Sequence, residues 1–457
     1  MVNQFRQCMD NANLSRKKVF LFGAGAALDW GGPKTVCNGE KLTFLPDHLP
    51  PHEITNRVCC LTHMILETGF LTKQRIQVAE SIYSHLQQRG IPTELLNFET
   101  IISFVEELFS HYAGSGRKGT SIYAEGKLPK WIKDLFRYRK KPVGNGAHHY
   151  SFSIPGRKHP NDYGVPNDLS PEQKFLEHLF HDIISGIVGH VSNYAFWGGD
   201  KSEVVNETND EINSGFVRWM KGITEAGDSV RMYTLNYDRI FKHLLADAGV
   251  QVFEGFMSED GEVEEPSLFA PDPNRIVSGK DTHVYYNLHG CVDWRVEDQN
   301  VNGLSAYQYF LSSFPHIETS LAVVEFEKGR KILLSNIVSG YQKVQRTYLT
   351  PIRQMLGSFD RDCLEADEIF LIGYSYGDEH INEIVRNAKK YNADIKLTLI
   401  NPYFDDNKFM LDFLLHWGRV NFGIYRNDGD DIVSDQFKVR AVRKTFGDYL
   451  KSVKAII

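Results

Sequence analysis

Two polar residues placed after apolar runs have side chains suited to acid–base chemistry. Asn236 lies in TLNYD (234–238) and His289 in LHG (288–290), and each follows a mainly apolar stretch. An amide donates and accepts hydrogen bonds, while a neutral imidazole can take a proton from a hydroxyl group or a water. A lone histidine at a strand end is usually structural, so a chemical role depends on companion residues.

A glycine-rich turn near the N-terminus is a candidate phosphate site. The run KKVFLF is followed by Gly23, Ala24 and Gly25. Because glycine lacks a Cβ, backbone N–H groups in such a turn can approach a pyrophosphate closely. Leu28 stands where the third glycine of a GxGxxG fingerprint would be. A tight strand-to-helix turn therefore explains this stretch equally well.

The elements that must position these residues are short apolar strands. They are KVFLFGAG, VRMYTLNYD, VYYNLHG, KILLSN, EIFLIGYSYG and IKLTLINP. Their non-alternating patterns are typical of parallel strands buried on both faces, and the helical patterns DRIFKHLLADAG and EHINEIVRNAKK follow two of them. The sequence predicts an α/β fold with a doubly wound, mainly parallel Rossmann-like sheet. A last helix is predicted within DQFKVRAVRKTFGDYLKSV.

The length of 457 residues exceeds what one hydrophobic core usually fills, so an insertion or a second domain is expected. NFETIISFVEELFSHY and EQKFLEHLFHDIISGIVGHV show helical periodicity. We predict a Rossmann-like core formed by residues 1–44 and 226–457. Residues 45–225 are predicted to form a mostly helical insertion or lid.

Composition excludes several classes of protein. The net charge of −7 argues against bulk attraction to nucleic acid, and we interpret the basic stretch 117–141 as a solvated loop or partner-docking surface. No apolar run resembles a signal peptide or membrane span, which predicts a cytoplasmic protein.

Six scattered cysteines without a CxxC pair predict reduced thiols. Glu177, His178 and His181 lack a distant third ligand, so no metal site is predicted.

Five short motifs, taken in order, resemble those of the sirtuin family. GAG followed by GGP, which ends at Pro33, resembles the opening loop GAGxSxxxGxP. TLNYD resembles T-x-N-x-D, LHG resembles the catalytic histidine and its glycine, and GYS (373–375) resembles G-x-S. IN (400–401) resembles the pair that closes on the adenosine. The resemblance covers residues 17–44 and 226–405, and all five motifs stand at predicted strand ends, where parallel sheets bind ligands.

The resemblance implies NAD as the bound dinucleotide and assigns roles to individual residues. Asn236 and His289 would carry the chemistry. The remaining residues would bind NAD: Gly23, Ala24, Gly25 and Pro33 at the pyrophosphate, and Gly373, Ser375 and Asn401 at the adenosine. Asp29 could meet the nicotinamide ribose or close an Asx-turn. Asp238 could belong to the site or cap the helix that follows it.

Departures from the family narrow the implied activity. Ala27 replaces the serine of the opening loop, Lys34-Thr35-Val36 replaces the usual Asp-Phe-Arg, and the zinc-binding CxxC pairs are absent from the sequence. These departures argue against the usual acyl-lysine channel. The pattern resembles the divergent bacterial sirtuin-like enzymes of antiphage defence, which hydrolyse NAD to nicotinamide and ADP-ribose. Such an NADase would need restraint, so we expect a homo-oligomer or a partner such as a HerA-like ATPase or a short Argonaute-type protein.

Two alternatives stay open. The same motifs would suit a regulatory module that binds NAD or ADP-ribose without turnover. GYSYG also fits the G-x-S-x-G nucleophile elbow of α/β serine hydrolases, with Ser375 as the nucleophile. Asp406 or Asp412 and then His416 follow in the order that such a triad requires.

Overall fold

The computed structural model describes a central α/β unit and several smaller pieces. The described residues are 16–30, 82–90, 98–111, 138–143, 147–152, 161–164, parts of 173–191, 210–257, 268–301, 304–312, 322–327, 330–340, 343–402, 426–429 and 431–453.

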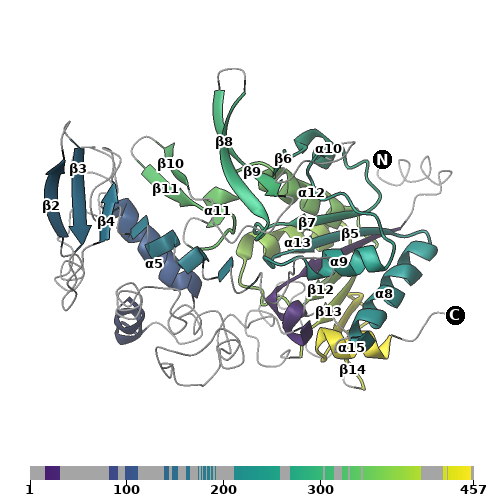
Figure 1. Ribbon diagram of the computed structural model, residues 1–457. Helices are drawn as coiled ribbons and strands as arrows, with labels where there is room; N and C mark the ends of the chain where they lie inside the picture. The colour runs from purple at the N-terminus through teal and green to yellow at the C-terminus, as the bar shows by residue number, and fades with distance from the viewer. Residues whose placement is uncertain are drawn as a thin grey trace.

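An eight-stranded sheet forms the centre of the molecule (Figure 1). Its strand order is β14-β15-β16-β13-β12-β1-β5-β7, and the strands from β16 to β7 run parallel. The strands are β1 (Lys17–Phe22), β5 (Ser229–Thr234), β7 (Val284–Asn287), β12 (Glu368–Ile372), β13 (Lys396–Ile400), β14 (Arg426–Asp428), β15 (Asp431–Ser434) and β16 (Val439–Val442). The predicted doubly wound, mainly parallel sheet is confirmed.

Helices pack in two groups against this sheet. One group is α8 (Asp210–Glu225), α9 (Ile240–Asp247) and α15 (Phe446–Ser452), joined by the 3-10 helix η1 (Ala24–Trp30). The other is α10 (Pro273–Ser278), α12 (Ile352–Leu364) and α13 (Glu379–Tyr391). Stacked aromatic rings join the first group to the sheet, with the Phe22 and Phe241 centroids 4.3 Å apart. Burial of such rings is a main source of stability in a core.

Outside the central sheet lie one two-stranded sheet and two three-stranded sheets. They are β10-β11, β2-β3-β4 and β6-β9-β8. Their strands are β2 (Tyr138–Val143), β3 (Ala147–Phe152), β4 (Asn161–Gly164), β6 (Leu268–Phe269), β8 (Trp294–Val301), β9 (Leu304–Ser312), β10 (Ala322–Glu327) and β11 (Arg330–Leu334). Two further helices are α5 (Phe98–His111) and α11 (Lys343–Arg346). Figure 1 shows β2, β3 and β4 well away from the central sheet.

Two sequence predictions about single elements were wrong. KILLSN forms β11, which pairs antiparallel with β10 rather than joining the central sheet. Only two residues separate these strands, so local pairing needs little loop closure. The predicted last helix is divided: Val439–Val442 forms β16, and α15 begins only after Thr445, whose side chain accepts a hydrogen bond from Asp448 N.

The segment predicted as a helical insertion has mixed structure. It contains α5, but strands occupy 138–143, 147–152 and 161–164. Its last helix, α8, packs against β5, α9 and α15 of the central unit. The division into a core and an insertion at residues 45–225 stays a prediction.

Candidate functional site

The chain reverses its direction of sheet growth at β1. From β1 it adds β5 and β7 on one side, then crosses to add β12, β13 and β16 on the other. The loops after β1 and β12 therefore meet at a topological switch point, where open α/β sheets bind ligands. Gly23 N donates to Ile372 O at 2.9 Å, and Gly25 N donates to Gly373 O at 2.9 Å.

Close packing between these two loops explains their glycines. Gly373 has φ +58°, and a Cβ on it would lie 2.1 Å from Ala26 N. A Cβ on Gly23 or Gly25 would lie 2.7 or 2.8 Å from Gly373 O. Real atoms do not approach this closely, so all three positions need glycine. Gly23 and Gly25 donate their N–H groups to protein carbonyls. The two glycines therefore serve the close packing of the loops, and their N–H groups are not donors to a ligand.

Asn236 lies in the loop after β5, and its side-chain amide makes no hydrogen bond to a described residue. The residue is 7% exposed, and within the described part of the chain neither side-chain atom has a hydrogen-bond partner. Its backbone is fixed: Asn236 N donates to Thr234 Oγ1 at 3.0 Å, and Asn287 Nδ2 donates to Asn236 O at 3.2 Å. A buried amide without partners costs stability unless a ligand or water completes it.

His289 occupies the equivalent place after β7. It is 2% exposed, and no described residue bonds its Nε2. Val338 N donates to His289 O at 2.7 Å. The next residue, Gly290, has φ +78°, and a Cβ there would lie 2.2 Å from Asn336 O. The glycine of LHG is thus required by the backbone that holds the histidine.

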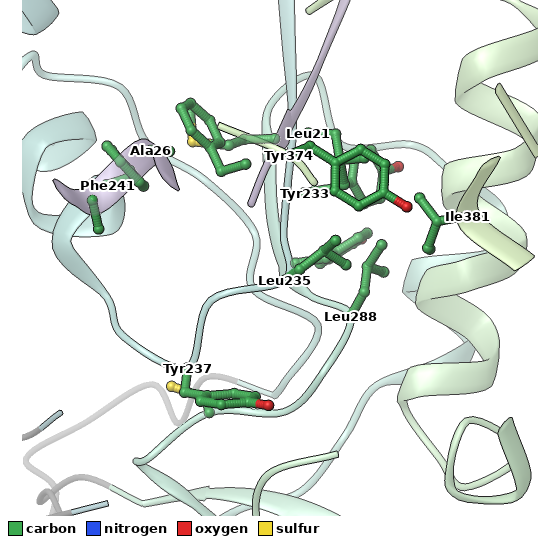
Figure 2. Packing of buried hydrophobic residues seen from close by; sticks show 14 of the residues in the cluster. Leu21, Ala26, Tyr233, Leu235, Tyr237, Phe241, Leu288, Tyr374 and Ile381 are labelled. Carbon is green, nitrogen blue, oxygen red and sulfur yellow. The ribbon is translucent and has the colours of Figure 1, made fainter. Parts of the chain in front are cut away.

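Apolar side chains surround the loops that carry Asn236 and His289. Leu235 and Leu288, the residues directly before them, are buried, and Leu288 N donates to Thr234 O at 2.9 Å. Figure 2 shows both leucines beneath Leu21 and Tyr374 at this end of the sheet. The two polar groups therefore follow adjacent strands, and the residue before each of them is packed in the apolar core.

The structure adds a second histidine that sequence reasoning missed. The ring centroids of His289 and His380 are 6.1 Å apart, and among the described residues His380 Nε2 also lacks a partner. Burial lowers the pKa of His289 well below its usual value, Lys343 and His380 lower it further, and Asp378 opposes them. Burial also lowers the pKa of His380. These shifts favour the neutral form of each ring, in which a ring nitrogen can accept a proton.

Three residues joined by ion pairs lie near these rings. Lys343 Nζ is 2.6 Å from Asp378 Oδ1 and 3.6 Å from Glu99 Oε1. Burial alone would raise the pKa of Asp378, but His289 and Lys343 outweigh it and lower that pKa to about 2. Glu99 belongs to α5, so this helix reaches the candidate site. DEH directly after GYSYG is the one sequence signal that could have indicated Asp378 and His380.

Three other predicted residues have structural partners. Asp238 Oδ1 accepts from Ile240 N at 3.1 Å, at the start of α9. Asp29 Oδ2 accepts from Gly447 N at 2.7 Å, at the start of α15. Asn401 Nδ2 donates to Tyr374 O at 3.3 Å. These bonds give each side chain a partner in the fold, while its role at NAD stays a prediction. Pro33 lies outside the described residues.

The predicted serine nucleophile is not supported by its described surroundings. Ser375 is exposed, and no hydrogen bond joins its Oγ to any described histidine or carboxylate. The residue with positive φ is Tyr376, at 61°, rather than the serine. Asp406, Asp412 and His416 lie outside the described residues.

The described residues form neither a metal site nor a membrane span. Among them, no group of three or more His, Cys, Asp or Glu side chains is arranged to hold a metal ion. His178 lies outside them, and His181 Nδ1 is 3.4 Å from Ser185 Oγ. No helix in this part of the chain is both long and apolar enough to cross a membrane.

Known structures of Sir2 homologues overlay only loosely on the chain. A variant of a Sir2 homologue in complex with ADP-ribose has 14% identity and a TM-score of 0.26, covering 53% of this chain and 63% of its own. The chain thus spans less than two thirds of that homologue. A second variant with ADP-ribose has 12% identity and a TM-score of 0.31, covering 96% of this chain and 90% of its own. A third, with 2′-O-acetyl ADP-ribose, has 10% identity and a TM-score of 0.29 with 97% and 93% coverage.

Comparison with protein families gives a more specific result. No curated protein matches the chain. Residues 230–404, from β5 to just beyond β13, match the model of the SIR2-like domain. This range contains Asn236, His289, Gly373, Ser375 and Asn401. The part of the chain that carries most of the candidate site is therefore similar to the SIR2-like domain family.

Proposed function

We propose that this protein is a sirtuin-like NAD hydrolase that cleaves NAD to nicotinamide and ADP-ribose through Asn236 and His289. One observation carries the proposal. Both side chains are buried at the carboxyl ends of adjacent parallel strands, and both amide atoms of Asn236 and the Nε2 of His289 lack partners among the described residues. They lie within the range that matches the SIR2-like domain. Such orphaned groups in a ligand-binding position favour a polar substrate over a structural role.

The proposed chemistry assigns one task to each side chain. The nicotinamide of NAD is cationic and leaves as a neutral molecule when its bond to the ribose breaks. Water supplies the oxygen of the new bond to that ribose carbon and loses one proton, which the neutral His289 accepts. Asn236 donates and accepts hydrogen bonds, so it can orient the water or a ribose hydroxyl. The atoms balance as NAD plus water giving nicotinamide, ADP-ribose and a proton.

The test compares wild type with His289→Ala in NAD, with products separated by chromatography and identified by mass spectrometry. Wild type should release nicotinamide and ADP-ribose, and the variant should be slower by about 10² to 10⁴-fold, the usual contribution of one acid–base group. An acetylated peptide should change neither rate nor products. Intact NAD with tight binding would support the alternative of a regulatory binding module. Intact NAD without binding would reject the sirtuin-like function.

The proposal also includes a role in antiphage defence and control of the activity by a partner. An unrestrained NADase would deplete its own host, so we propose control by self-association or by a second protein such as a HerA-like ATPase or a short Argonaute-type protein. The support is the resemblance to antiphage sirtuin-like enzymes. If the dilute isolated chain already cleaves NAD at its full rate, this control is rejected while the hydrolase stands.

A further inference from the structure

Three charged residues from three separate elements are joined by ion pairs, and two of them act on His289. Glu99 comes from α5, Lys343 from α11, and Asp378 directly precedes α13. Lys343 is within 3.6 Å of Glu99 and 2.6 Å of Asp378. Asp378 is the N-cap residue of α13, yet its side chain makes no capping hydrogen bond. The carboxylate is held by the lysine instead of by its own helix.

Several described groups act on His289 or on the ion-paired residues Glu99, Lys343 and Asp378. Lys343, Asp378 and His380 act on the imidazole directly. Glu99 acts through Lys343. Burial, Glu99 and Asp378 together raise the pKa of the phenol of Tyr237, which lies in the loop after β5. The set holds one cation and two carboxylates, so each substitution of a charged residue should shift the pKa of His289 in a defined direction.

We propose that Lys343 and Asp378 are positioning residues that set the charge beside His289, and that Glu99 fixes Lys343 from α5. The catalytic meaning of this inference rests on the proposed function. The imidazole becomes a cation when it takes the proton. A carboxylate nearby stabilises that cation, whereas an ammonium group opposes it and keeps the resting ring neutral. The segment containing α5 thereby takes part in the site.

The signs of the two charges give the expected results. Asp378→Asn removes a negative charge, so the pKa of His289 should fall. Lys343→Met removes a positive charge and releases Asp378, so that pKa should rise. Each substitution removes a charge that acts on the imidazole, so each should move the His289 midpoint in the direction that the sign of that charge dictates. Loss of packing alone would not move the two variants in opposite directions.

The experiment follows the imidazole signal of His289 by NMR in labelled protein as the pH is lowered, with His289→Asn used to assign the signal. Midpoints that move down in Asp378→Asn and up in Lys343→Met support the proposal. Midpoints that stay unchanged, or move in one direction in both folded variants, overturn it. If Lys343→Met does not fold, Lys343→Gln replaces it and should also raise the midpoint. Glu99→Gln tests the third residue and should lower the midpoint less than Asp378→Asn does.

A closely matched control lies at the opposite end of the sheet. Lys18 and Glu368 form an ion pair at 2.7 Å with 16% and 18% exposed side chains, against 14% and 17% for Lys343 and Asp378. Lys18→Met and Glu368→Gln should leave the His289 midpoint unchanged. Lys343→Arg keeps the charge and should also leave it unchanged.

NMR titration and NAD turnover separate the two proposals. Opposite pKa shifts without NAD cleavage would support the positioning roles and reject the hydrolase. Cleavage with unshifted midpoints would support the hydrolase and reject the positioning roles. Where both hold, the acid limb of the rate profile should move with each midpoint, because His289 acts only when deprotonated.

Discussion

Two buried polar regions on the same sheet are built in opposite ways. Between β5 and α12, Asp362 is fully buried and saturated: Arg231 Nε and Tyr233 OH each donate to its Oδ2 at 2.5 Å, and Lys17 Nζ donates to Oδ1 at 3.1 Å. In the loops after β5 and β7, Asn236 and His289 are also buried, but both amide atoms of Asn236 and the Nε2 of His289 lack partners among the described residues.

This difference distinguishes polar groups that hold the fold from polar groups kept for a ligand. A paired buried charge is costly to disturb because its partner is left alone. An unpaired buried group already costs about 1–3 kcal/mol, and natural proteins tolerate such groups mainly at functional sites. Substitutions should therefore reduce the free energy of unfolding in the first region and activity in the second.

The largest effect on stability is expected from Arg231→Met. Removing the guanidinium leaves the fully buried Asp362 with Lys17, Tyr233 and the more distant Arg361. Loss of one partner from a buried pair costs about 3–5 kcal/mol, measured as the free energy of unfolding in denaturant. The control Arg275→Met breaks a 2.6 Å pair with Asp281 whose arginine is 45% exposed, and it should cost less than about 1 kcal/mol. Equal losses in the two variants would contradict the comparison.

The sequence predicted the central unit well because its signals are local. Each buried strand next to the switch point is a short apolar run, and the glycines after β1 and β12 mark the turns that follow. Reading Gly23 and Gly25 as pyrophosphate donors missed their partner, since Gly373 is 348 residues beyond Gly25 and occupies the space that a Cβ would need. Contacts between loops so distant in sequence leave no local pattern.

Gly373→Ala should have the next largest effect, because it bears on both stability and the site. The added Cβ meets Ala26 N at 2.1 Å and the backbone has φ +58°. Separation of the two loops should cost about 2–4 kcal/mol of unfolding free energy and weaken NAD binding measured by calorimetry. Gly357→Ala in α12 has nothing within 4 Å of the new methyl group. It should be neutral or stabilising by up to about 1 kcal/mol, and a loss as large as that of Gly373→Ala would reject this explanation.

The second half of the candidate site could not be predicted from motifs. Asn236 and His289 were found because each ends a strand within a recognisable short motif. Glu99 and Lys343 come from elements without such motifs, and only the ion pairs in the fold connect them to Asp378. Conversely, Asp29 and Asp238 were candidates by position, but the structure gives both carboxylates helix-start N–H groups to bind.

The most direct test of the central claim measures unfolding free energy and NAD cleavage together for Asn236→Leu. Leucine has the same number of side-chain heavy atoms in the same branched arrangement, and it leaves no polar atom without a partner. We predict a free energy of unfolding within about 1 kcal/mol of wild type, on either side, and NAD cleavage reduced by about 10²-fold or more. Retained cleavage, or a stability loss comparable to that of Arg231→Met with unchanged cleavage, would show that Asn236 serves the fold and contradict the assignment of this site.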